Sequence, residues 1–253
     1  EPQLALAQFP ADIWPQDCDI AALQQALQPL FRTDFVREKW VVTYGQSEIE
    51  IGLDQGEVRA GDLSEALSEI ELELLKGNTA DLLALAGELA AHDGLRQGSL
   101  SKAARGYHLA QGNPPREVRS LQVLKPAAKA TVEQGMIAAF ELALNHWQYH
   151  EELWLRGDAQ ARGAVIEAVG TIRQALVIFG GLVPRKASAD LRARLTELEP
   201  LLADKAAQPE TLCYSTAYLQ CKLALTSWLV SGAWRPFIDA KGQTKLDGSF
   251  KRF

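Results

Sequence analysis

Apolar residues follow a strand-like alternation in the first part of the chain. The segment "RTDFVREKWVVTYG" predicts a strand that turns near Gly45, and "SEIEIGLDQGEV" predicts a second strand that ends near Gly56. These two strands form an antiparallel hairpin, and "SEIELELL" at residues 68–75 predicts a third strand. A helix follows in "NTADLLALAGELAAHDG", with Asn78 or Thr79 as its cap and Gly94 as its stop.

After residue 112 the apolar residues recur at three- and four-residue intervals, the period of a helix buried on one face. Short connections with Gly or Pro separate four such stripes, which predicts an antiparallel helical bundle. The stripes are Met136, Phe140, Ala143, Trp147, His150 and Trp154; Val165, Val169, Ile172, Leu176 and Phe179; Leu191, Leu195, Leu198 and Leu202; and Tyr218, Cys221, Leu225 and Trp228.

The change of period coincides with the segment "QGNPPREV" at residues 111–118. Its glycine, asparagine and two prolines can continue neither a helix nor a central strand. We therefore predict two domains, 1–112 and 113–253, and an α+β fold class. An antiparallel β domain comes first and an all-α helical bundle follows.

Charge differs between the two predicted domains. Residues 1–112 carry 18 acids and 8 Lys or Arg, a balance of −10, whereas residues 113–253 carry 14 acids and 18 bases, a balance of +4. Neither part is basic enough to indicate nucleic acid, and no apolar run approaches the roughly 20 residues that cross a bilayer. We expect no nucleic-acid or membrane partner, and the three sparse cysteines favour a reducing, cytoplasmic compartment.

Three glutamates, Glu69, Glu71 and Glu73, alternate with apolar residues and so project from one face of the third strand. A solvated outer face is the ordinary explanation of such alternation. However, residues 48–73 contain nine acids and one base, and like charges on neighbouring positions repel. Converging carboxylates suit Mg²⁺ or Mn²⁺, and they raise the pKa of a member that can then act as a general base.

Basic residues that suit phosphate oxygens occur in the same predicted domain. Arg37 and Lys39 share one face of the first strand, and Lys102 and Arg105 lie among serines and glycines in "LRQGSLSKAARGYHLA". We group this segment with the strands of one small β domain. A single base is most often solvated, but the combination with an acidic strand face predicts a site for a divalent metal and a polyanion.

These segments resemble a known family. "REKWVVTYGQSEIEIGLDQGEVRAGDLSEALSEIELELL" and "LRQGSLSKAARGYHL" are similar to the later two-thirds of a CYTH domain, and the second part of the chain resembles a CHAD domain. CYTH is the fold of triphosphate tunnel metalloenzymes, which include thiamine triphosphatases, class IV adenylate cyclases and bacterial inorganic triphosphatases. The resemblance implies an eight-stranded antiparallel tunnel lined by acids and bases.

The resemblance also implies roles for individual residues. Metal-assisted hydrolysis of inorganic triphosphate to diphosphate and phosphate is the implied reaction, with Mg²⁺ or Mn²⁺ as cofactor. The implied catalytic residues are Glu69, Glu71 and Lys102; the phosphate-binding residues are Arg37, Lys39, Lys102 and Arg105; and the metal ligands are Glu50, Asp54, Glu71 and Glu73.

The sequence departs from the family pattern in both parts. Residues 1–30 hold no counterpart of the opening Glu-x-Glu-x-Lys motif, and "DGSFKRF" lacks a stop signal, so we expect a partial CYTH and a partial CHAD domain. In the bundle, His150 lies on the apolar stripe, which favours a core histidine over a ligand, and His146 precedes it by one turn. Candidate bases for polyphosphate are Lys125, Lys129, Arg173, Arg185 and Lys186, each solvated by default.

Other functions remain open from the sequence. The chain could be a non-catalytic polyphosphate-binding fragment, a scaffold that contacts other proteins through its helices, or another tunnel enzyme such as an adenylate cyclase or a thiamine triphosphatase. No apolar or aromatic cluster near the basic segments demands a nucleobase, which favours a small triphosphate.

Overall fold

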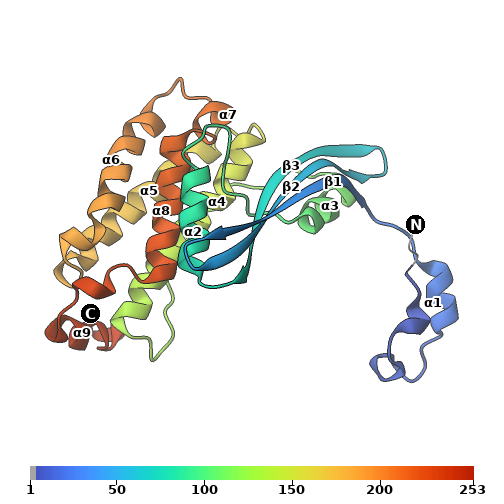
Figure 1. Cartoon of the computed structure of the whole chain (residues 1–253), viewed down its shortest axis with the longest axis horizontal. Helices are drawn as coiled ribbons and strands as arrows, with labels where there is room; N and C mark the ends of the chain where they lie inside the picture. Colours follow the sequence, from blue (N-terminus) through green and yellow to red (C-terminus); the bar gives the residue numbers. More distant parts are fainter. Residues whose placement is uncertain (1–3) are drawn as a thin grey trace. The chain divides into compact units, whose positions relative to one another are not determined.

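The computed structural model describes residues 4–253 and contains an antiparallel three-stranded sheet followed by a helical region (Figure 1). Two compact units make up the chain: Glu1–Val36, Asp54–Glu69 and Leu100–Pro114 in unit 1, and Arg37–Leu53, Ile70–Ser99 and Pro115–Phe253 in unit 2. The division crosses each continuous strand. The units are therefore not the predicted domains, and the boundary at residue 112 stays a prediction.

The sheet has the order β1-β2-β3, formed by Arg32–Tyr44, Ser47–Ala60 and Leu63–Lys76. Tight turns join the strands at Gly45 and Gly61, whose φ values of 59° and 57° lie in the left-handed region that favours glycine. All three predicted strands are confirmed, but β2 continues through Gly56. A Cβ there would lie 2.0 Å from the Asp34 carbonyl oxygen, so this glycine permits close approach of β1 instead of ending the strand.

The predicted α+β order, an antiparallel sheet followed by helices, is confirmed. The described residues contain three of the eight strands that a closed tunnel would need.

Unit 1 also holds helix α3, Lys102–Ala110, which corrects the grouping of this segment with the strands. Ser101 begins the helix, because its Oγ accepts the Ala104 N–H at 3.1 Å. Leu109 packs with Val58 of β2, and Gly106 lies so close to Phe31 that a Cβ would be 2.1 Å from the ring. Short helices precede the sheet: η1 Leu6–Gln8, η2 Ala11–Ile13 and α1 Ile20–Ala26.

Unit 2 holds the helical bundle. Helix α4 packs along α5, α6 packs on both α5 and α8, and α2 packs on α8. Their bounds are Thr79–Leu89 for α2, Val132–Leu155 for α4, Ala161–Ile178 for α5, Ala189–Ala203 for α6 and Thr216–Ser231 for α8. Shorter elements are α7 Pro209–Leu212, α9 Ala240–Leu246, η3 Phe179–Gly181, η4 Arg185–Ser188, η5 Arg235–Phe237 and η6 Phe250–Arg252.

Burial confirms the four predicted stripes, since every residue named in them is buried. Asn78 caps α2, as predicted, by accepting the Asp81 N–H at 3.0 Å. That helix ends at Leu89, before Gly94, whose N–H donates to the Tyr214 carbonyl at 2.9 Å.

One segment of the bundle has the length and composition of a membrane span, contrary to the expectation that no apolar run is long enough. Residues Ala161–Gly181 have a mean hydropathy of 1.4, and 44% of that stretch is buried inside the protein. The core helix of a bundle meets the same criteria, because one face is packed with apolar side chains. The expected absence of a membrane partner stays a prediction.

Candidate functional site

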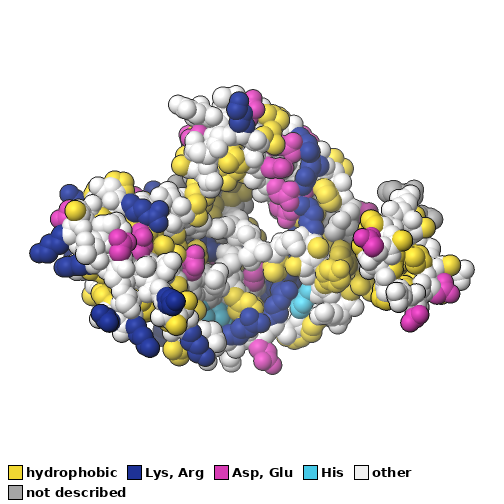
Figure 2. Space-filling model, turned by 90° about the horizontal axis from the view of Figure 1, so that it is seen from below, with side chains coloured by type: hydrophobic (Ala, Val, Ile, Leu, Met, Phe, Trp, Pro, Cys, Tyr) yellow, Lys and Arg dark blue, Asp and Glu magenta, His cyan; other side chains and the backbone are white. Residues whose placement is uncertain are grey.

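Charged side chains of neighbouring strands pair on one face of the sheet. In unit 2, Lys39 Nζ of β1 lies 2.8 Å from Glu50 Oε1 of β2, and Arg37 Nη2 of β1 contacts Glu71 Oε2 of β3. In these strands residues 37 and 39 of β1, 50 of β2 and 71 of β3 therefore project to the same side, as the alternation predicts. In the space-filling view, acidic and basic side chains adjoin one another at several places on the surface (Figure 2).

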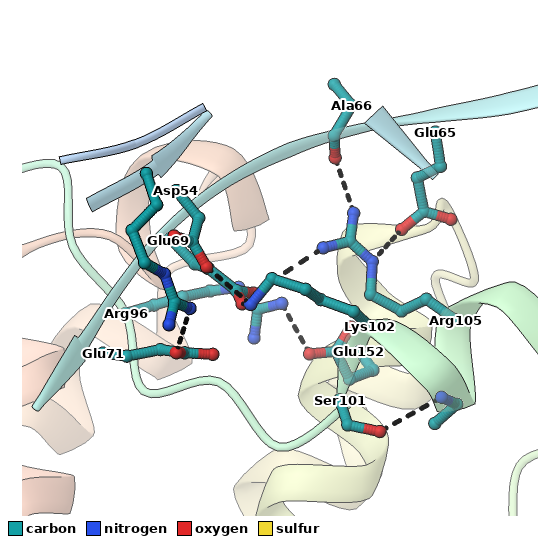
Figure 3. Close-up of polar contacts among 12 residues, drawn as sticks. Asp54, Glu65, Ala66, Glu69, Glu71, Arg96, Ser101, Lys102, Arg105 and Glu152 are labelled. Atoms are coloured by element: carbon teal, nitrogen blue, oxygen red, sulfur yellow. Dashed lines mark hydrogen bonds and ion pairs between the residues drawn. The ribbon is translucent and has the colours of Figure 1, made fainter. Parts of the chain in front are cut away.

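In unit 1, one ammonium group bridges two carboxylates. Lys102 Nζ, at the first turn of α3, lies 2.7 Å from Asp54 Oδ2 and also contacts Glu69 Oε1 (Figure 3). The Asp54 side chain is fully buried, and those of Lys102 and Glu69 are 15% and 26% exposed. Two residues predicted as catalytic and one predicted as a metal ligand thus meet at a single point.

Arg105, one helical turn after Lys102, contacts acidic and carbonyl oxygens of β3. Its Nε donates to Glu65 Oε1 at 2.9 Å, its Nη2 donates to the Ala66 carbonyl at 2.5 Å, and Nη1 lies 3.9 Å from Glu69 (Figure 3). Glu65 was not among the predicted site residues. The signal was present, because residue 65 has the same strand parity as residues 69, 71 and 73.

Three of the predicted acids converge closely enough to bind one cation. Carboxylate oxygens of Asp54, Glu69 and Glu71 lie within 4.8 Å of one another, and Glu69 and Glu71 are adjacent same-face positions of the continuous strand β3. Three carboxylate oxygens with water at the remaining positions fit the octahedral oxygen preference of Mg²⁺. Within the described residues, Glu73 is exposed and outside this cluster, and Glu50 pairs with Lys39 instead.

The histidines of the bundle behave as the stripe predicts. His150 is fully buried, its Nδ1 donates to the His146 carbonyl at 2.7 Å, and its Nε2 accepts the Arg119 N–H at 3.0 Å. Both ring nitrogens of His150 therefore have hydrogen-bond partners, as expected for a core histidine. His146 Nε2 lies 3.2 Å from Glu167 of α5; burial, followed by the neighbouring His150, lowers the pKa of His146.

A buried ion network in unit 2 was missed by the sequence reasoning. Glu151 of α4 accepts from Lys222 of α8 at 2.8 Å and from Arg96 at 3.0 Å, and Arg96 also reaches Glu152 at 2.5 Å. Lys222 and Glu151 are 1% and 0% exposed. Burial lowers the pKa of Lys222, whereas for Arg96 the carboxylates of Glu152 and Glu151 outweigh burial and raise its pKa.

Arginines of the bundle include two of the predicted polyphosphate bases. Burial, followed by the positive charges of Arg185 and Arg173, lowers the pKa of Arg192. Arg173 is also held by Glu199, with both donor–acceptor distances at 2.9 Å.

Comparisons with known proteins match both parts of the chain. The sequence model of the CYTH domain matches residues 3–107, and that of the CHAD domain matches residues 138–253. Over 83 residues the chain is 46% identical to a protein of Haemophilus influenzae named "Inorganic triphosphatase". That alignment covers 33% of this chain and 24% of the relative, so the chain spans about a quarter of the relative it matches.

Proposed function

Because the chain contains a CYTH domain followed by a CHAD domain, we propose that it takes part in metal-dependent hydrolysis of inorganic triphosphate to diphosphate and phosphate. The observation that carries the proposal is the meeting of Asp54, Glu69 and Lys102 beside Glu71. A tetra- to pentavalent anion needs cations around it, and a divalent metal needs carboxylates. This face of the sheet supplies both.

The chemistry divides among the charged residues of the sheet and α3. Lys102, Arg105, Arg37 and Lys39 bind phosphate oxygens, and their charge neutralises the negative charge that spreads over the oxygens in the transition state. Asp54, Glu69 and Glu71 would hold Mg²⁺ or Mn²⁺, which supplies polarisation of the phosphoryl oxygens when bound.

Within the same proposal, Glu69 orients the attacking water by accepting one of its hydrogens. The position suits this role because the Glu69 side chain is 26% exposed and has neighbours of both signs. A positioned water close to the terminal phosphorus lowers the barrier mainly by orientation.

A second activity, polyphosphate binding at the helical region, is supported by one observation. The positive charges of Arg185 and Arg173 both contribute to lowering the pKa of Arg192, and a polyanion bound there would offset that repulsion. Such binding would weaken steeply as salt rises, since it depends on cation–phosphate contacts.

The proposed hydrolysis is tested by phosphate release from inorganic tripolyphosphate, with Mg²⁺ and with a chelator. We expect metal-dependent release that falls by about 10²–10³ in Glu71→Gln, because one of the three carboxylates proposed to hold the metal is lost. Glu38→Gln is the matched control, since Glu38 is an exposed glutamate at a position of opposite parity on β1. Absence of release from the folded wild-type chain, or full activity in Glu71→Gln, would contradict the proposal.

A further inference from the structure

The ammonium group of Lys102 contacts two of the carboxylates that are proposed to bind the metal. Its ammonium lies 2.7 Å from Asp54 Oδ2 and contacts Glu69 Oε1, and these two residues supply oxygens of the three-carboxylate cluster. The single positive charge of Lys102 is thus shared between two acids, one of which is the fully buried Asp54. A buried carboxylate requires such a partner, because its desolvation is otherwise uncompensated.

The location of Lys102 in α3 is unusual for a lysine. It is the first residue of a nine-residue helix whose N-cap is Ser101, and a cation there is unfavourable to the helix dipole. The acids at residues 54 and 69 offset that cost. When these acids are bound to another cation, the lysine and the helix N-terminus together favour an anion instead.

From this geometry we propose that Lys102 is an exchangeable counter-ion. A divalent metal displaces its ammonium from Asp54 and Glu69, and the released ammonium then binds a phosphate oxygen of the substrate. The second half of this exchange rests on the proposed function, whereas the first half requires only the metal.

The proposal predicts effects of opposite sign on two ligands. Removing the Lys102 charge removes a competitor for the metal and a binding group for the phosphate. Substitution of a residue that only binds substrate would leave the metal affinity unchanged. Substitution of a residue that only supports the fold would weaken the binding of both the metal and the phosphate.

The experiment is calorimetric titration of the whole chain with Mn²⁺ in the absence of phosphate, and separately with inorganic tripolyphosphate in the presence of a chelator. For Lys102→Met we expect Mn²⁺ affinity to rise about tenfold or more and tripolyphosphate affinity to fall about tenfold or more. Lys102→Gln keeps an N–H donor for the buried Asp54, and it should shift both affinities in the same directions if the methionine variant does not fold.

Arg105→Met is the matched control. The close partners of Arg105 are Glu65 and the Ala66 carbonyl, and it lies 3.9 Å from Glu69. Arg105→Met should therefore weaken the binding of tripolyphosphate while changing the Mn²⁺ affinity by less than about threefold. Unchanged or weaker Mn²⁺ binding by a folded Lys102 variant would overturn the exchange. A rise in Mn²⁺ affinity without hydrolysis by the wild type would support the exchange and count against the proposed function alone.

Discussion

Two charge clusters among the described residues each pair a buried acid with a lysine, Glu151 with Lys222 and Asp54 with Lys102, yet they differ in access to water. In the bundle, Lys222 and Glu151 are 1% and 0% exposed, and Trp147 lies beneath the ammonium at 5.7 Å. At the sheet, Lys102 of α3 is 15% exposed and its partner Glu69 is 26% exposed, although its other partner Asp54 is fully buried. Access decides what each cluster can do, because only a partly solvated pair can exchange its partner for a metal or a phosphate.

Burial makes the bundle network a structural element. Removing one partner of a dry ion pair leaves the other charge without compensation, which costs far more than the pair contributes when intact. At the sheet, Glu69 is open to water that can replace a lost partner, so a change on that side affects ligands more than folding, whereas the fully buried Asp54 still needs a donor.

The largest loss of stability is expected for Lys222→Met. Glu151 would lose one of its two cations in the core, and we expect the free energy of unfolding to fall by about 3–5 kcal/mol. Urea denaturation measures this loss. The matched control is Arg173→Ala, which breaks an ion pair whose side chains are 29% and 40% exposed and should cost at most about 1 kcal/mol. Equal losses of unfolding free energy in the two variants would contradict the distinction between buried and solvent-exposed ion pairs.

The second-largest effect concerns thiol reactivity, which tests whether water is excluded from the core of the bundle. Burial raises the pKa of Cys213 and Cys221 from 9.0 to about 12. At pH 8 their thiolate fractions fall about a thousandfold, so a thiol reagent should modify the half-buried Cys18 first. Rapid modification of all three cysteines in the folded protein would show that the core is open.

The same pKa shifts give a direction for stability against pH. The folded state holds these thiol protons more tightly than the unfolded chain does. Their contribution is therefore complete below about pH 9 and is lost as the pH rises toward about 12.

A smaller effect is expected where α3 meets Phe31. In Gly106→Ala the new Cβ would lie 2.1 Å from the Phe31 ring, which should destabilise the packing of α3 by about 1–3 kcal/mol. Thermal denaturation followed by circular dichroism measures the change. Gly98→Ala, where no atom lies within 4 Å of the added Cβ, should stay within about 0.5 kcal/mol. A Gly106 variant as stable as this control would show that α3 is not packed against Phe31.

Periodicity predicted the elements that bury one face. The stripe containing Trp147 and His150 became the core of α4, and the alternation of Glu69 and Glu71 placed both on one side of β3. Helix α3 was not predicted, because its helical signals lie in a nine-residue segment with a central glycine, and Gly106 serves close packing. The Glu151–Lys222 pair was missed because it joins residues 71 positions apart, and charged residues are usually exposed.

Ammonium NMR of the lysine side chains in ¹⁵N-labelled protein would test most directly whether the sheet charges exchange while the bundle charges do not. Lys102→Met and Lys222→Arg identify the two signals. On addition of millimolar Mg²⁺, and then of tripolyphosphate, the Lys102 signal should shift at each step and the Lys222 signal should stay in place. A Lys102 signal that does not move while calorimetry detects Mg²⁺ binding, or a Lys222 signal that moves instead, would contradict the account.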